Sequence, residues 1–171
     1  MNVRHVALVL IATALVLSTS ACGGKEDRGP SAAPGPAECP QTFTESSGPS
    51  SDRSGELVPA GADTALLCVY PFGTGDNVGT FQLRRSLSAA ASPDRVTEYL
   101  NRLIAFDSGT VVGCGLMGHD QYQIALGYPD GTHAVVRVDY SCGKVSAAGA
   151  TRRLERADTL LAFWPNPGIT G

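Results

Sequence analysis

The sequence has few of the features that mark the common catalytic and nucleic-acid-binding classes of protein. Lys25 and Lys144 are its two lysines, and its 13 basic residues are outnumbered by 16 acidic ones. Binding a phosphate backbone needs clustered positive charge, so this balance argues against nucleic acid as a partner. The sequence also contains no G-x-S-x-G nucleophile elbow and no H-E-x-x-H metal motif. The hydrolases that these motifs define are therefore excluded.

The positions of the arginines in the sequence do not predict a basic surface either. They cluster at 84–85 and at 152, 153 and 156, where the runs are short and interleaved with acidic residues. We interpret these positions as solvated faces of the domain.

Long apolar runs are absent after residue 24, and the run before it is short. Arg4 precedes Val6–Leu17, twelve residues that are mostly apolar. A membrane-spanning helix needs roughly 20 such residues, whereas a positive start, a short apolar centre and small residues at the end are typical of a cleaved export signal. Residues 1–21 are therefore predicted to be a signal peptide.

The small residues Thr19, Ser20 and Ala21 come directly before Cys22, which is followed by two glycines. This stretch resembles the lipobox of bacterial lipoproteins and departs from the family pattern at Thr19, where Leu is usual. The resemblance implies that Cys22 receives a diacylglyceryl group and that cleavage occurs just before it. Ordinary secretion is the alternative, because Thr19 and Ala21 also fit a plain signal-peptidase site.

Lipid at Cys22 predicts attachment to the outer face of the cell membrane, with membrane lipid as the first partner. Acyl chains contribute about 0.8 kcal/mol per buried methylene, so two or three chains give stable anchoring without a spanning helix. Cleavage removes one arginine and no acid, which leaves 12 basic against 16 acidic residues, a formal charge of −4. The alternative location is secreted.

Four cysteines remain for an oxidising compartment, in which disulfides form. We favour the sequential pairing of Cys39 with Cys68 and of Cys114 with Cys142, because each closes a loop of about 30 residues. A zinc site made of Cys114, His119, His133 and Cys142 is the alternative. Its ligands lack the close pairs of structural zinc sites, so no metal site is predicted.

Composition divides the chain after the signal into a tether and one domain. Residues 23–37 contain no large apolar side chain, three prolines and four glycines, a composition that cannot offset the entropy of ordering. The predicted organisation is a signal peptide at 1–21, the lipidated cysteine and flexible tether at 22–37, a single domain at 38–167 with a mobile loop at 44–56, and a tail at 168–171.

Alternating apolar residues predict strands in three places. The run Ala65–Tyr70 is typical of a buried strand, and 80–87 alternates as its antiparallel partner, with Phe81, Leu83 and Leu87 on one face. The stretch 122–140 predicts a hairpin. A three-residue loop at 129–131 gives the two strands matching parity, pairing Tyr128 with Thr132 and Ile124 with Val136.

Two helices are predicted. One begins with Ser92 as N-cap and Pro93 at its first position, and its apolar stripe is formed by Val96, Tyr99, Leu100, Leu103 and Ile104. The other, within 151–165, places Leu154, Ala157, Leu161 and Trp164 on one face. The expected fold is α+β: an antiparallel sheet of about four to six strands with two helices on one face, in roughly ββα-ββα order, stapled by two disulfides.

Several motifs suggest chemistry but have a more ordinary interpretation. The segment 113–118 matches the G-x-G-x-x-G dinucleotide fingerprint, yet a strand-like sequence follows where a helix is needed. The glycines at 73–79 fit a turn between strands better than an anion cradle. Phe163 and Trp164 are more typical of core than of a sugar-stacking platform. No cofactor is predicted.

The leading functional hypothesis is a non-enzymatic, membrane-tethered module that binds an envelope protein or a small ligand. The four-cysteine spacing and the stretches "ALLCVYP" and "YPDGTHAVVRVDYSC" resemble uncharacterised lipoproteins of actinobacteria, a group that implies no activity. The alternative is a small envelope hydrolase in which His119 or His133 serves as acid or base, with Asp120 or Asp139 as its candidate partner. No catalytic residue is assigned.

Overall fold

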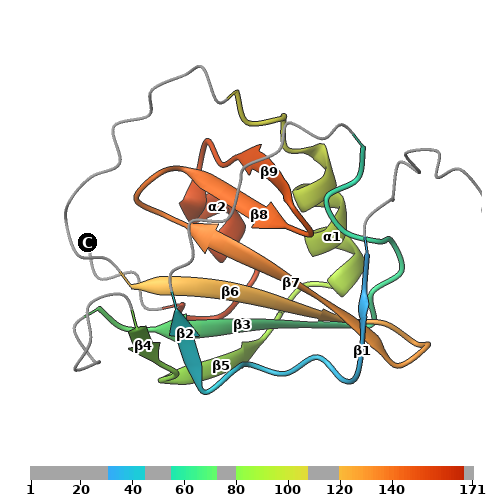
Figure 1. Cartoon of the computed structure of the whole chain (residues 1–171), viewed down its shortest axis with the longest axis horizontal. Coiled ribbons are helices and arrows are strands. Elements are labelled where there is room, and N and C mark those ends of the chain that lie inside the picture. Colours follow the sequence, from blue (N-terminus) through green and yellow to red (C-terminus); the bar gives the residue numbers. More distant parts are fainter. Residues whose placement is uncertain (1–30, 45–54, 73–79, 108–119, 168–171) are drawn as a thin grey trace, which may run out of the picture.

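The fold is a seven-stranded antiparallel sheet with two short helices and a small two-stranded sheet (Figure 1). The computed structural model describes residues 31–44, 55–72, 80–107 and 120–167. The large sheet has the strand order β5-β3-β6-β7-β8-β9, with β1 also paired to β7, and β2 pairs with β4. The elements are β1 (Ala33–Pro34), β2 (Thr42–Thr44), β3 (Thr64–Tyr70), β4 (Thr80–Gln82), β5 (Arg85–Ser88), α1 (Pro93–Arg102), β6 (Gln121–Gly127), β7 (Thr132–Asp139), β8 (Lys144–Ala147), β9 (Ala150–Arg153) and α2 (Ala157–Leu161).

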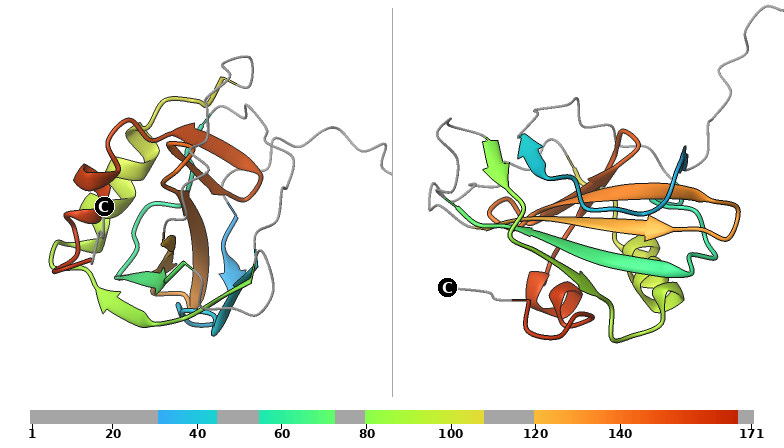
Figure 2. Two further views of the ribbon diagram at one scale, coloured as in Figure 1. Left: turned by 90° about the vertical axis from the view of Figure 1, so that its left-hand side faces the viewer. Right: turned by 90° about the horizontal axis from the view of Figure 1, so that it is seen from below.

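Strand β3 is buried on both faces, as its continuous apolar sequence predicts. Because side chains alternate along a strand, Leu67 and Val69 enter the larger core, whereas Cys68 and Tyr70 enter a smaller core on the opposite face. Both helices lie on the face of the larger core, and the small sheet that contains β2 lies on the other (Figure 2). The expected antiparallel sheet with two helices is therefore present, but the fold is mostly β, with seven strands in the sheet where four to six are predicted.

The β6–β7 hairpin has the predicted register. Ile124 is opposite Val136, and the N–H of Tyr128 donates to the carbonyl of Thr132 at 3.0 Å across the three-residue loop. Gly131 has a φ of +79°, the left-handed conformation that its place in the turn requires. The prediction from side-chain parity is confirmed.

The predicted helix after Ser92 is α1, and Val96 and Leu100 on its stripe are fully buried. Glu98 and Arg102 form the expected i,i+4 ion pair at 3.3 Å on the exposed side. Two details of the prediction are wrong. Ser92 makes no side-chain capping hydrogen bond, and the helix ends at Arg102, which leaves Ile104 55% exposed.

The single strand predicted over 80–87 is two strands in different sheets. The N–H of Leu83 donates to Gln41 beside β2, while the next N–H, that of Arg84, donates to Val69 of β3. Adjacent N–H groups of an extended chain point in opposite directions, so the chain passes here from one sheet to the other. Phe81 consequently packs in the smaller core and Leu87 against the larger one.

The predicted C-terminal helix is present but shorter, and the ββα-ββα order is not the one observed. Ala150–Arg153 forms strand β9, which pairs with β8, and the helix is confined to Ala157–Leu161. The hairpin turn consists of Ala148 and Gly149, both with positive φ, which is the pattern of a two-residue type I′ turn. Trp164, beyond the helix, is buried, and its Nε1–H donates to the carbonyl of Ala65 at 3.3 Å.

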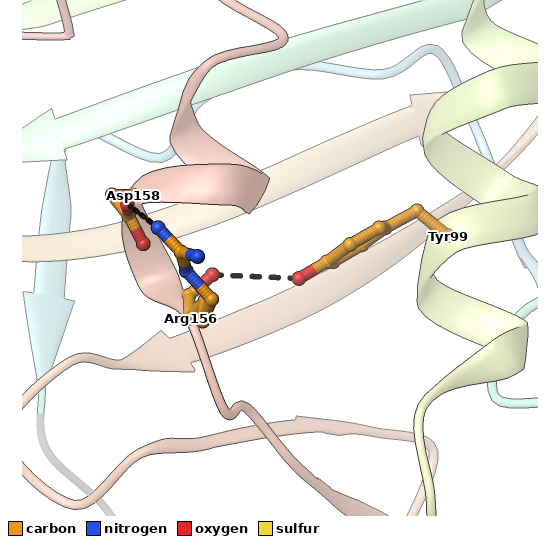
Figure 3. A network of polar contacts seen from close by, with 3 residues as sticks. All are labelled: Tyr99, Arg156 and Asp158. Atoms are coloured by element: carbon orange, nitrogen blue, oxygen red, sulfur yellow. Dashed lines mark hydrogen bonds and ion pairs between the residues drawn. The ribbon is translucent and has the colours of Figure 1, made fainter.

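A small polar network fixes α2 beside α1 (Figure 3). The hydroxyl of Tyr99 donates to the carbonyl of Arg156 at 3.4 Å, and the guanidinium of Arg156 contacts Asp158 at 3.0 Å. Burial raises the pKa of Tyr99, and the hydrogen bond from Arg156 lowers the pKa of Asp158. The network is peripheral and joins structural elements only.

Arg152 corrects the expectation that the arginine cluster at 152–156 is solvated. Only 3% of Arg152 is exposed, and its guanidinium donates to the carbonyls of Thr151 at 3.1 Å and Gly55 at 2.7 Å. Arg153 and Arg156 are exposed and form ion pairs with Glu155 and Asp158. Arg152 is therefore a structural arginine that holds the segment before β3 against β9.

We predict that Arg152→Ala lowers the free energy of unfolding by about 2 kcal/mol, because the buried guanidinium and its hydrogen bonds to Thr151 and Gly55 are lost. Urea unfolding followed by circular dichroism measures the change. Arg153→Ala is the matched control. Its exposed ion pair predicts a change within about 0.5 kcal/mol, and equal effects of the two substitutions would contradict the assignment.

Asp130 gives the hairpin a pH-dependent contact. The hydroxyl of Thr132, at 2.6 Å, and its N–H, at 2.9 Å, donate to the Asp130 carboxylate and hold the pKa of that group below its ordinary value. Since the folded-state pKa is lowered, the stabilisation is present above the unfolded pKa of about 3.9 and is lost as the pH falls through the folded value.

Asp130→Asn keeps an acceptor oxygen but cannot titrate. We expect the wild-type chain to be the more stable of the two above pH 5 and the difference to shrink steadily below about pH 4. Thermal unfolding at intervals between pH 2.5 and 6 follows the difference, and a gap that stays constant over this range would refute the coupling.

Candidate functional site

The structure describes some of the predicted cysteines and histidines. Cys39, Cys68, Cys142 and His133 lie within the described segments, whereas Cys22, Cys114 and His119 lie outside them, as do the motif at 113–118, the glycine loop at 73–79 and residues 45–54 of the predicted mobile loop. Lipid attachment at Cys22 therefore stays a prediction.

Cys39 and Cys68 form the first predicted disulfide, with an S–S distance of 2.04 Å. Cys68 is fully buried in β3, and the hydroxyl oxygen of Ser86 lies 3.2 Å from Sγ of Cys39. The bond joins the chain that follows β1 to β3, the strand next to the β5 edge of the sheet.

Cys142 lies in the turn between β7 and β8 and is disulfide-bonded. Its N–H donates to Oδ1 of Asp139 at 3.0 Å, and the same carboxylate lies 3.5 Å from Nζ of Lys144. The predicted partner, Cys114, is outside the described residues, so the second pairing stays a prediction.

His133 contacts the N-terminal segment instead of a catalytic partner. Its Nδ1 lies 3.0 Å from the carbonyl oxygen of Gly35. Asp139 is six residues along the same strand, about 20 Å away, and Asp120 lies at the far end of β6, where it accepts from the N–H of Phe72 at 3.1 Å. The fold therefore brings neither predicted carboxylate to this imidazole. Among the described residues there is also no group of histidine, cysteine and acidic side chains that could hold a metal ion.

The segment that His133 contacts is the end of the predicted flexible tether. Ala33 and Pro34 pair with His133 and Thr132 of β7, and the N–H of Gly35 donates to the carbonyl of Gly131 at 3.0 Å. The flexible tether predicted to extend to residue 37 is therefore wrong in its last part. The amino-acid composition of this segment does not predict the strand, because the strand is held by backbone hydrogen bonds, which do not depend on the side chains.

After β1, the N-terminal segment passes over β6 at Gly127, which has no side chain to obstruct it. A Cβ atom at this position would lie 3.1 Å from the Cβ of Ala37 and 3.2 Å from that of Thr64. These distances are shorter than ordinary carbon contacts, so a side chain at position 127 would displace the crossing segment. Ala37 in turn packs against the smaller core.

An aromatic cluster lies at the other end of the sheet. Phe43, Tyr70 and Phe81 pack together in the smaller core, and Phe72, 60% exposed, extends the cluster to the surface. Burial raises the pKa of Tyr70 to about 12, and its hydroxyl donates to the carbonyl of Pro40 at 2.9 Å. The ionised phenolate is thus unavailable near neutral pH, and the cluster is suited to apolar contact.

Arg137 on β7 closes one side of this cluster. Its guanidinium carbon lies 4.6 Å from the ring centroid of Phe43, and its Nη2 donates to the carbonyl of Thr44 at 2.6 Å. The position was missed in the sequence because Arg137 occupies a polar place in an alternating strand, where a solvent-facing residue is the ordinary expectation. Its contact with Phe43 depends on the second sheet.

Comparison with protein-family models, curated proteins and solved structures finds no match to this chain. No helix in the described part of the chain is long and apolar enough to cross a bilayer. The fold and contacts of this chain therefore carry the functional argument by themselves.

We expect the double substitution of Cys39→Ala with Cys68→Ala to lower the free energy of unfolding by about 3–4 kcal/mol, because the closed loop spans 29 residues. Denaturation by urea without reductant measures the loss. Ser86→Ala, beside the sulfur, is the control and is predicted to change stability by less than about 0.5 kcal/mol. A double variant as stable as the parent would show that the bond contributes nothing to the folded state.

Proposed function

We propose that this chain is a lipid-anchored extracytoplasmic module that binds an envelope component without catalysing a reaction. Residues 1–24 support the anchor, because they resemble the export signal and lipobox of bacterial lipoproteins. The Cys39–Cys68 disulfide supports the location, because such bonds persist in oxidising compartments. The disulfide is the single structural observation that carries the location.

His133 is engaged in holding the N-terminal segment. Its Nδ1 lies 3.0 Å from the carbonyl oxygen of Gly35, which gives this imidazole a structural role. The exposed side chain of Phe72 gives the module an apolar contact point, backed by the buried rings of Phe43 and Phe81. A protein or a small apolar ligand of the envelope is the class of partner that this surface suits.

The anchor is tested by growing a bacterial host that expresses the full chain with radiolabelled palmitate. We expect label on the protein and a mature chain that begins at Cys22, whereas Cys22→Ala should be unlabelled and uncleaved at that bond. The control is the double variant Cys39→Ala with Cys68→Ala, which should keep the label because its lipid-bearing residue is intact.

Two outcomes would contradict the proposal in different ways. An unlabelled product cleaved elsewhere and found in the medium supports secretion in place of anchoring. An unlabelled product that begins at Met1 and stays inside the cell refutes export altogether.

A further inference from the structure

The β6–β7 turn contains the one Asp–Gly step of the sequence, Asp130–Gly131, and the sequence has no Asn–Gly step. Such a step can rearrange, because glycine has no side chain to shield its amide nitrogen. That nitrogen bonds to the carboxyl carbon of the aspartate, and one carboxyl oxygen leaves as water with the amide proton and the carboxyl proton. Water then opens the succinimide ring. Opening at the main-chain carbonyl yields isoaspartate, in which the main chain runs through the former side chain.

The step lies where the reaction can occur and where its product would alter a structural contact. Asp130 and Gly131 are exposed, so water reaches them. The carbonyl of Gly131 accepts from the N–H of Gly35 at 3.0 Å, and Thr132 pairs with Pro34 of β1. Isoaspartate adds one atom to the main chain directly before Gly131, which changes the path of the chain at the carbonyl that Gly35 uses.

The attacking nitrogen is held in the folded turn. The N–H of Gly131 donates to the carbonyl of Tyr128 at 3.0 Å. Tyr128 is itself fixed, because its N–H donates to Thr132 at 3.0 Å and its hydroxyl donates to the carbonyl of Pro59 at 3.0 Å. To react, the Gly131 nitrogen has to lose its proton and turn toward the carboxyl group. The hydrogen bond to Tyr128 opposes both changes.

The carboxyl group is held as well. Its Oδ1 accepts from the hydroxyl of Thr132 at 2.6 Å and from the N–H of Thr132 at 2.9 Å. Hydrogen bonds to the ionised form lower the pKa of Asp130. The reaction proceeds through the neutral acid, which can release water, so Thr132 keeps the reactive form scarce. Any residue at position 132 other than proline supplies the N–H, but the hydroxyl is specific to threonine and serine.

We propose that Asp130–Gly131 is a latent site of isoaspartate formation, and that the Thr132 hydroxyl and the hydrogen bond from Gly131 to Tyr128 keep it unreacted in the folded domain. Thr132 is a positioning residue in this proposal, since it holds the carboxyl group and takes no part in the bonds that form and break. The reaction consumes and returns one water molecule and needs no other reactant.

The rate of isoaspartate formation tests the proposal. The purified full chain is kept for several weeks at neutral pH, either folded in buffer or unfolded in urea with reductant. Isoaspartate at position 130 is measured by mass spectrometry of its peptides with electron-transfer fragmentation. We expect the folded wild-type chain to react more slowly than the unfolded chain. Thr132→Val keeps the N–H and the branched shape, and it should raise the folded rate about fivefold, the factor that one hydrogen bond represents, without changing the rate in urea.

Two variants are matched controls. Thr132→Ser keeps a hydroxyl at this position and should react at the wild-type rate. Thr64→Val removes the corresponding contact between the Thr64 hydroxyl and Asp63, which is 3.0 Å long, and should leave the rate at position 130 unchanged. Circular dichroism checks that each variant is folded before the incubation.

Three outcomes would overturn the proposal. Equal folded rates for the wild-type chain and Thr132→Val would remove the role of the hydroxyl. A folded wild-type chain that reacts as fast as the unfolded chain would show that the turn gives no protection. Equal acceleration in Thr64→Val and Thr132→Val would show that lower stability, and not the contact with Asp130, sets the rate.

Discussion

Strand β3 has apolar side chains on both faces, and both faces need to be covered for the sheet to be stable. Leu67 and Val69 project toward the helices, and Cys68 and Tyr70 project the other way. Removing one such side chain from water contributes about 1.5–3 kcal/mol, so neither set can be left exposed in a domain of this size. The helices cover the first face. The small β2–β4 sheet covers the second face. The Cys39–Cys68 bond attaches the segment just before β2 to β3.

The parts predicted from the sequence are those in which one local pattern decides the structure. Parity across Tyr128 and Thr132 fixes the hairpin loop, because a loop one residue shorter would turn every side chain to the other face. The stripe through Val96 and Leu100 has helical spacing and no strand-like alternation, so α1 is also determined locally. The continuous apolar run of β3 predicts burial on both faces.

The parts that sequence patterns missed depend on distant backbone partners. In residues 80–87 Phe81, Leu83 and Leu87 share one face, as in a single strand, yet the amides of Leu83 and Arg84 find acceptors in two separate sheets. The β8–β9 hairpin turns at Ala148, a residue that seldom adopts positive φ, so the usual asparagine–glycine signal is absent. Arg152 is similar, since its acceptors, among them the carbonyl of Gly55, carry no side-chain signature.

The candidate site shows the same division between local and distant information. The cysteines of the first disulfide could be paired from loop length and compartment, whereas the partner of His133 could not, because Gly35 was assigned to a polar, proline-containing segment. The aromatic cluster gathers residues from β2, β3 and β4, which come together only when the second sheet forms.

Because Gly127 and Ala37 lie so close together, the size of the residue at either position limits the size allowed at the other. A methyl group gained by Gly127 occupies space now held by the Cβ of Ala37, so the N-terminal crossing has no room for both. Homologous chains that share this crossing should therefore keep both sites small, or enlarge one only by shrinking the other. Small residues at both positions would therefore indicate, from the sequence alone, that the N-terminal segment of a homologous chain crosses β6 in the same way.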